Sequence, residues 1–318
     1  MELGADINKE NHHGVTPLFT ACSNGHITIV KHENVIKYLL ELGADINKEN
    51  HHGVTPLFTA CSNGHITKVK YLVVYNVDIY KESKSGTTVL MEACWSKNLN
   101  LIKYLVELGM DVNKEDNSGQ TPFFNACQEG HEDIVEYLVE LGANINKENN
   151  YGVTPLFFTA CSNGHITIAK YLVVYIYGAD INKEDDNGLT PLFYACSNGN
   201  IPLVKYLVSL GTNIPKESNE GKTPLFKACY NGHKSIVKYL VELGANVNKE
   251  NRYGGTPLHS LIEKGYIAIV KYLVEKGVNI NKENNVGNNP LFLACIEGNI
   301  IVVKYLWNLK QILIKETV

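Results

Sequence analysis

Apolar residues follow one another along the chain with the spacing of short paired helices. Within residues 122–127 they form one helical face, and within residues 134–141 they recur at spacings of one, three, four and seven. These spacings are typical of α-helix and differ from the alternation of a strand. A polar stretch rich in turn-forming residues follows at 144–152. The pattern predicts a helix, a second helix and a projecting loop.

The ends of these two helices are marked by residues with known conformational preferences. Thr121 is a suitable N-cap, and Pro122 fits the first helical turn, where no hydrogen-bonding N–H is needed. Gly130 and Gly142 stand where left-handed residues end helices. The predicted helices are therefore about two turns long, which is too short to bury their apolar faces without neighbours.

The same unit is written nine times, which explains how those faces are buried. The repeated motif is G-x-T-P-L-F-x-A-C-x-x-G-H, followed by I-V-K-Y-L-V-E-L-G-A-D-I-N-K-E. We number the repeats one to nine by the residue at the Thr position: Thr16, Thr55, Thr88, Thr121, Thr154, Thr190, Thr223, Thr256 and Asn289. The step is 33 residues, except for one step of 39 and one of 36. A fixed period in this range indicates stacked repeats.

The period and the T-P-L head resemble those of ankyrin repeats, and the resemblance covers essentially the whole chain. It implies an all-α fold, an α-solenoid with β-hairpin loops, in which residues 1–318 form a single solenoid of about nine repeats. With helix layers ~10 Å apart, nine repeats would extend roughly 90 Å. Phe replaces the His of the family's T-P-L-H motif in most repeats, and only repeat eight keeps it, as His259.

Four segments depart from the regular repeat. Residues 29–36 contain six extra residues that should lengthen the second helix of repeat one or bulge outward. Residues 83–98 lack the Pro and the Gly-His pair, and residues 157–178 carry an extra Phe and a longer second helix. One inserted residue turns a helical face by about 100°, so we expect a bulge there. Residues 307–318 form a divergent, apolar C-terminal helix.

Composition narrows the range of functions. The net charge is −4, from 29 basic and 33 acidic residues, so no broad cationic surface predicts nucleic-acid binding. Nine Lys-Glu pairs, from Lys9-Glu10 to Lys282-Glu283, stand in the loops and are interpreted as a solvated rim. The longest apolar run, 171–177, is too short to cross a bilayer, and no secretory signal precedes the first repeat. We therefore expect an intracellular, cytoplasmic protein without membrane insertion.

The cysteines favour the same compartment. All eight occupy one position of the first helix, where equivalent residues of adjacent layers lie ~10 Å apart, beyond the ~7 Å limit for a disulfide. They are predicted to be buried, reduced core residues. The eight are Cys22, Cys61, Cys94, Cys127, Cys161, Cys196, Cys229 and Cys295.

Three motifs could carry chemistry, and each has a simpler interpretation. Cys-x-x-x-His, as in Cys127 and His131, could bind metal, but a core cysteine and a loop-bracing histidine are favoured. His12-His13 and His51-His52 are interpreted as exposed loop residues. Gly221-Lys222-Thr223 resembles the end of a phosphate-binding loop but lacks its earlier glycine. We expect no enzyme activity, no metal and no cofactor.

The resemblance implies that the loops and first helices line a concave groove that binds another protein. At the positions facing a partner, several repeats carry distinctive side chains in place of the common ones, and aromatic and arginine residues dominate binding hot spots. These candidates are Trp95, Gln128, Glu129, Tyr151, Lys222, Tyr230, Arg252 and Tyr253. Two alternatives remain open. The chain could be a structural spacer that self-associates through its uncapped ends, or the substrate-recognition part of a longer adaptor or effector.

The family also suggests a modification. Hydroxylated asparagines in such repeats lie in the loop within a Leu-x5-Asp-Val/Ile-Asn pattern. Asn47 and Asn113 match this pattern fully, so both are candidate hydroxylation sites.

Overall fold

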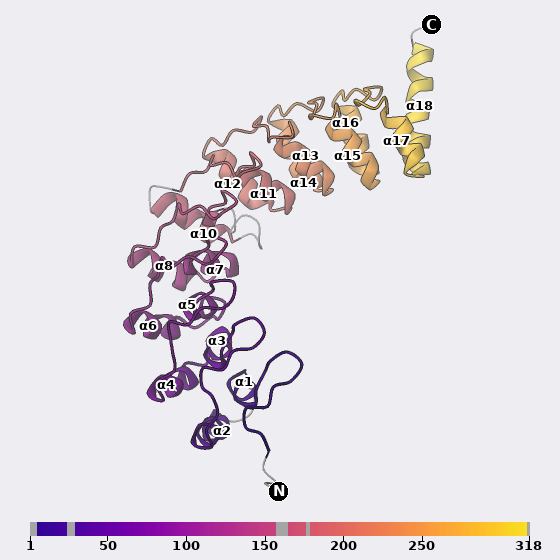
Figure 1. Ribbon diagram of the computed structural model, residues 1–318. Coiled ribbons are helices and arrows are strands. Elements are labelled where there is room, and N and C mark those ends of the chain that lie inside the picture. The colour runs from indigo at the N-terminus through magenta and orange to yellow at the C-terminus, as the bar shows by residue number, and fades with distance from the viewer. Residues whose placement is uncertain (1–4, 24–28, 157–164, 176–178, 317–318) are drawn as a thin grey trace. The chain divides into compact units, whose positions relative to one another are not determined.

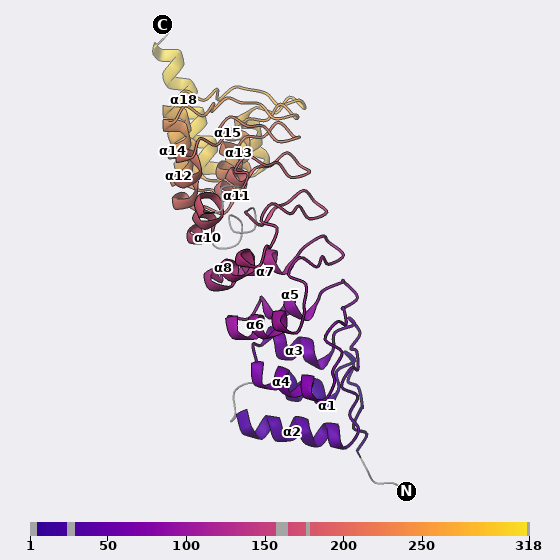
Figure 2. The ribbon, with the colours of Figure 1, turned by 90° about the vertical axis from the view of Figure 1, so that its left-hand side faces the viewer.

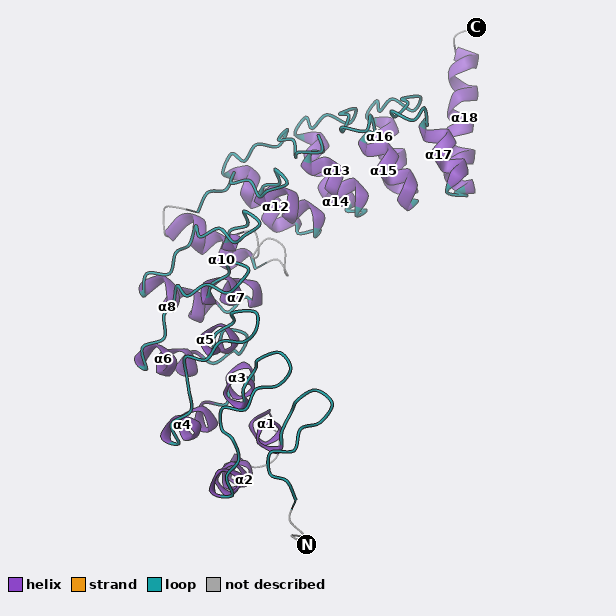
Figure 3. Ribbon diagram, viewed as in Figure 1, coloured by secondary structure: helices purple, strands orange, loops and turns teal. Residues whose placement is uncertain are grey.

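The computed structural model describes residues 5–23, 29–156, 165–175 and 179–316. The chain divides into two compact units, residues 1–150 and residues 151–318. We call them the N-terminal unit and the C-terminal unit. Within the described residues the regular elements are all helices, and no strand is present (Figures 1 and 3). The all-α class expected from the sequence is therefore confirmed.

Within the described residues, every repeat contributes a second helix and every repeat except the fifth contributes a first helix. The first helices are α1 (Pro17–Ser23), α3 (Pro56–Ser62), α5 (Val89–Ala93), α7 (Pro122–Glu129), α11 (Pro191–Ser197), α13 (Pro224–Tyr230), α15 (Pro257–Lys264) and α17 (Pro290–Ile296). The second helices are α2 (Ile29–Glu41), α4 (Ile66–Val74), α6 (Leu99–Glu107), α8 (Glu132–Glu140), α10 (Ile166–Lys170), α12 (Ile201–Ser209), α14 (Lys234–Glu242), α16 (Ile267–Glu275) and α18 (Ile300–Glu316).

The helix ends follow the predicted residue preferences. Thr121 is extended at the N-cap of α7, with Pro122 in the first turn. Gly130 ends the helix with φ 78°, a left-handed conformation that costs a glycine little. Asn76 takes the same role after α4 with φ 58°, and asparagine is among the few other residues that tolerate it.

Stacking within each unit joins like helices of consecutive repeats. In the N-terminal unit α1, α3, α5 and α7 pack in sequence, and in the C-terminal unit α11, α13, α15 and α17 do so. The Leu, Phe, Ala and Cys of the first helices before α17 are almost fully buried, as are aliphatic residues of the second helices such as Val135 and Leu138. The core is therefore a continuous inter-repeat layer within each unit.

The departures from the regular repeat appear as altered helices. The helix α2 has 13 residues, where α4, α6 and α8 have nine. The helix α5, in segment 83–98, has five. In repeat five, α10 passes into a π-helix, η1 (Tyr171–Tyr175), a form that accommodates inserted residues. Residues 157–164 and 176–178 of this segment lie outside the described residues. The helix α18 continues for 17 residues.

Candidate partner-binding surface

The loops between repeats project to one side of the helices within each unit (Figure 2). Each loop closes on itself, as in repeat two, where the Asn50 N–H donates to the Val54 carbonyl at 2.9 Å. Each loop also bonds to the preceding one, as where the Asn117 N–H donates to the Ser85 carbonyl at 2.9 Å. These bonds hold the loops at a constant spacing, so side chains on them occupy defined positions.

The Lys-Glu residues of the loops form ion pairs between repeats. The lysine of one loop pairs with the glutamate of the preceding loop at 2.7 to 2.9 Å, as in Lys48 with Glu10 and Lys282 with Glu250. We call this series the loop ion-pair ladder. Its side chains are partly exposed, so solvent screens each pair and its contribution to stability is small. The sequence interpretation of a solvated rim missed this pairing, although the 33-residue period implies it.

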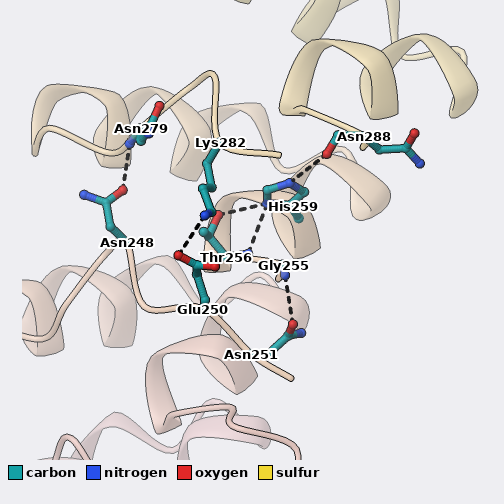
Figure 4. A network of polar contacts seen from close by, with 9 residues as sticks. All are labelled: Asn248, Glu250, Asn251, Gly255, Thr256, His259, Asn279, Lys282 and Asn288. Atoms are coloured by element: carbon teal, nitrogen blue, oxygen red, sulfur yellow. Dashed lines mark hydrogen bonds and ion pairs between the residues drawn. The ribbon is translucent and has the colours of Figure 1, made fainter. Parts of the chain in front are cut away.

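Repeat eight adds a buried polar connection to its neighbour (Figure 4). The His259 Nδ1 accepts the Thr256 backbone N–H at 3.1 Å and lies 2.9 Å from its hydroxyl oxygen. The Nε2 lies 3.3 Å from the Asn288 carbonyl in repeat nine. An accepting Nδ1 leaves the proton on Nε2, which then donates to that carbonyl. Burial lowers the pKa of His259, so the ring is kept neutral.

Three of the predicted partner-binding residues lie in the N-terminal unit. Trp95 is exposed just after α5, and its carbonyl accepts from His131 at 3.4 Å in the next repeat. Gln128 and Glu129 lie half-buried in the last turn of α7, which packs on α5. Nearby, burial raises the pKa of Glu92. The surface here is aromatic and polar, without a clustered cation.

The C-terminal unit brings other predicted residues together around a cavity. Lys222 and Tyr230 line a cavity of about 300 Å³ together with Phe226, Lys227 and Ser260. An adjoining cavity of about 220 Å³ shares both lysines and extends along the loop residues of repeats six and seven. Lys227 and Ser260 were not predicted from the sequence, because they stand in the middle of a first helix and not on a loop or at a helix end.

Cations cluster around Tyr230. The Lys264 ammonium lies 4.5 Å from the centre of the Tyr230 ring, a cation–π contact. The Arg252 guanidinium donates to the Asn219 carbonyl on the preceding loop. Lys222 pairs with Glu220 at 2.7 Å, and this bond lowers the pKa of the glutamate. With Lys227, four cations surround the two cavities.

The two remaining predicted residues lie on loop tips. The side chains of Tyr151 and Tyr253 are exposed, while their carbonyls accept the Asp186 and Asn285 N–H groups of the following loops. Their positions are thus fixed by the backbone, and their side chains lie at the surface.

The sequence contains a signal that would have found Lys227 and Ser260. Their position in the first helix varies between repeats, whereas its Ala-Cys neighbours are nearly constant. The described residues at this position are Thr20, Thr59, Glu92, Asn125, Tyr194, Lys227, Ser260 and Leu293. A core position repeats its residue, so this variation distinguishes one repeat from the next, and six of these eight residues are at least partly exposed, Asn125 and Leu293 being buried.

The cysteines follow the prediction with one exception. Six of the seven described thiols are buried, and burial raises their pKa, to about 12 for Cys22. Cys295 is exposed, so the prediction that all are buried was wrong there. No described repeat packs against the outer side of α17 to cover it. Cys161 lies outside the described residues.

The Cys-x-x-x-His motif acts as a brace. The Nε2 of His233 lies 2.8 Å from the Ser197 carbonyl at the end of the preceding first helix, and His65 contacts the Ser23 carbonyl in the same way. The cysteine points into the core instead. Among the residues that the structure describes, no three His, Cys, Asp or Glu side chains are grouped to hold a metal ion.

The two candidate hydroxylation sites bridge consecutive loops. The Asn47 amide oxygen accepts the Asp78 N–H at 2.9 Å, and that of Asn113 accepts the Asn144 N–H at 3.0 Å. A hydroxylating enzyme would have to open these bonds. Hydroxylation at either site stays a prediction.

The fold and surface define a class of protein, one built from stacked helix-loop-helix repeats whose loops carry the variable residues. The family description "Ankyrin repeats (3 copies)" matches residues 31–116, 110–185, 172–251 and 243–315, and "Ankyrin repeat" matches residues 13–48. The chain belongs to the ankyrin-repeat family. Such repeats are generally protein–protein interaction modules and typically non-catalytic. A comparison with curated proteins gave no match. Within the described residues no helix is long and apolar enough to cross a membrane.

Proposed function

We propose that the chain is a non-catalytic, intracellular binding module that holds a protein partner on the first helices and loops of its C-terminal unit. The single observation that carries this proposal is the pair of adjoining cavities around Lys222, Lys227 and Tyr230. An exposed aromatic ring beside a recess is typical of residues that dominate binding energy. The partner would fill the recess and cover the ring.

The charges around the cavities favour a partner segment with acidic side chains. Lys222, Lys227, Arg252 and Lys264 stand on loops and helices of repeats seven and eight, and Glu220 neutralises one of them. Complementary charge raises the association rate and excludes wrong partners. The other predicted residues Trp95, Gln128 and Glu129 lie in the N-terminal unit. There they would contact a different part of the partner.

The test is a selection of peptides from a random display library on the immobilised chain. We expect peptides enriched in Asp and Glu, with affinity that falls as salt rises. Tyr230→Ala and Lys227→Glu should each weaken the best peptide about tenfold or more, equivalent to about 1.4 kcal/mol. Fluorescence anisotropy would measure the affinities.

Matched variants on a second helix, away from the cavities, provide the control. Tyr239→Ala and Lys234→Glu change the same residue types on α14, outside the cavity lining. They should leave peptide affinity unchanged, with circular dichroism confirming that every variant folds. Equal affinity of the wild type and the folded Tyr230→Ala variant would refute the proposal.

A further inference from the structure

Repeat nine exposes a face that the interior repeats bury. Three residues after the Thr position, Phe58, Phe193 and Phe226 are at most 2% exposed, whereas Phe292 is 56% exposed. In the interior, the first helix of the following repeat packs over this position, as α15 does on α13. Cys295 is exposed for the same reason. Repeat nine therefore offers the apolar surface on which another repeat of this kind would stack.

Repeat one exposes the complementary face. Pro17 is exposed, whereas Pro56 and Pro122, at the same position in later repeats, are buried. Tyr38 is 61% exposed, while its counterparts in the second helices of later repeats are half-buried. These are the side chains that a preceding repeat covers within each unit.

The loop ion-pair ladder leaves one charge of opposite sign on each of these faces. In the seven described pairs of the ladder, the lysine pairs with the glutamate of the loop before it. Lys9 has no described preceding glutamate, and Glu283 has no described following lysine. At the regular spacing of the ladder, Glu283 and Lys9 are the two halves of one further pair.

The second helices carry a cation–π series with the same polarity. The Lys238 ammonium lies 5.5 Å from the ring centre of Tyr272, and Lys271 lies 5.5 Å from that of Tyr305. In the six pairs of this series, the lysine belongs to the earlier repeat. Continued by one step, the series would place Lys304 of repeat nine over a tyrosine, and Tyr38 of repeat one stands at the equivalent tyrosine position.

A third series joins loops through asparagine. The Asn248 amide oxygen accepts the Asn279 N–H at 2.7 Å, and the Asn8 oxygen accepts the Asp45 N–H at 2.8 Å. Asn281 stands at the acceptor position in repeat nine, and Asp6 at the donor position in repeat one. Each of the three series thus has complementary groups at its two ends.

We propose that the chain of residues 1–318 associates head to tail, with repeat nine of one copy stacking on repeat one of a second copy. Phe292 packs beneath the first helix of the second copy, beside its Pro17. Glu283 pairs with Lys9, and Lys304 covers Tyr38 of that copy. Such a heterologous contact leaves a free face at each end, so association continues beyond a dimer.

Each of the three series ends in different groups on repeat one and on repeat nine. This difference favours a head-to-tail contact between two copies over a two-fold symmetric contact. A two-fold contact that aligned the loops of two copies of repeat nine would bring Glu283 near Glu283 and Lys304 near Lys304, which like charges oppose. A head-to-tail contact matches a donor with an acceptor in all three series. This inference is independent of the partner cavities around Tyr230.

Sedimentation velocity over a wide concentration series tests the proposal on the intact chain. We expect the mass of the wild type to rise with concentration above the 35.4 kDa of one copy. Phe292→Asp should remove this rise. Ile301→Asp is the matched control, because Ile301 is 62% exposed at a position that interior repeats also leave exposed, such as Asp133 and Ser235. It should associate like the wild type.

Mixing experiments test the direction of stacking. Tyr38→Asp blocks repeat one and Phe292→Asp blocks repeat nine, so each variant alone should stay monomeric. Their mixture keeps one intact face of each kind and should form a dimer that grows no further. Glu283→Lys should weaken association at least tenfold, and the double variant with Lys9→Glu should restore it.

Three outcomes would overturn the proposal. A wild type that stays monomeric at every concentration would leave the face to a following repeat of a longer chain or to an unrelated partner. Loss of association in Ile301→Asp would point to nonspecific apolar contact. A mixture of Tyr38→Asp and Phe292→Asp that stays monomeric, with both variants folded by circular dichroism, would exclude the head-to-tail direction.

Discussion

The heads of repeats two and eight share a backbone and differ in chemistry. Thr55 and Thr256 are both extended N-caps, with φ −106° and ψ 168° in the first and φ −103° and ψ 169° in the second. In repeat two, Phe58 is buried and no described group bonds to the Thr55 hydroxyl. In repeat eight, His259 contacts the equivalent hydroxyl, that of Thr256, and its other ring nitrogen reaches the Asn288 carbonyl of repeat nine.

The difference shows that two kinds of contact can join the same repeats. A buried hydroxyl without a partner costs about 1–3 kcal/mol. Burying a phenylalanine side chain contributes about 1.5–3 kcal/mol. The two effects are similar in size, so the stack tolerates Phe at a position where the family motif has His. Repeat two is joined by apolar packing, and repeat eight by a polar network.

The largest expected effect comes from removing the apolar contact. Phe58→Ala should lower the free energy of unfolding by about 3–5 kcal/mol, because it leaves a cavity between repeats. Urea denaturation followed by circular dichroism would measure it. At concentrations low enough to keep the chain monomeric, Phe292→Ala is the matched control: the same residue type at the same repeat position, but exposed. Its effect should stay within about 0.5 kcal/mol, and equal losses would contradict the role assigned to burial.

A smaller loss is expected when repeat eight is given the chemistry of repeat two. His259→Phe removes the acceptor of the Thr256 N–H and the donor to the Asn288 carbonyl. Unpartnered groups cost about 1–3 kcal/mol, partly offset by the apolar ring. We expect a net loss of about 1–2 kcal/mol near neutral pH, measured by urea denaturation. An unchanged stability would show that the polar network contributes nothing.

The pH dependence of this loss checks its cause. Burial lowers the pKa of His259 in the native state below its ordinary value of 6.5. As the pH falls below 6.5, the unfolded chain binds a proton that the native state refuses, so the stability contributed by the neutral ring is lost. The phenylalanine variant has no such group. The stability difference between wild type and variant should therefore shrink from pH 7 toward pH 5.

The sequence predicted the features that depend on neighbouring residues. The helix pairs, their Thr-Pro starts and their Gly ends follow from the local spacing of residues. The repeat and its family were therefore evident from the sequence. It did not reveal that Lys48 pairs with Glu10, or that Lys227 lines a cavity with Tyr230. These contacts join residues of different repeats or depend on which helix face turns outward. The exposure of Cys295 was missed because burial depends on the next layer.

The smallest effects concern the two threonine hydroxyls, and they should have opposite signs. Thr55→Val keeps the shape and removes a buried hydroxyl without a described partner, so stability should stay equal or rise by up to about 1 kcal/mol. Thr256→Val removes a hydroxyl that lies 2.9 Å from the His259 Nδ1, so stability should fall by about 1 kcal/mol. Both variants would be compared by urea denaturation at neutral pH. Opposite signs would show that the residue three positions later decides what an N-cap hydroxyl contributes, since backbone and burial are shared. A loss of equal size in both repeats would mean that the hydroxyl acts through the helix start itself, and the contrast between the two heads would fail.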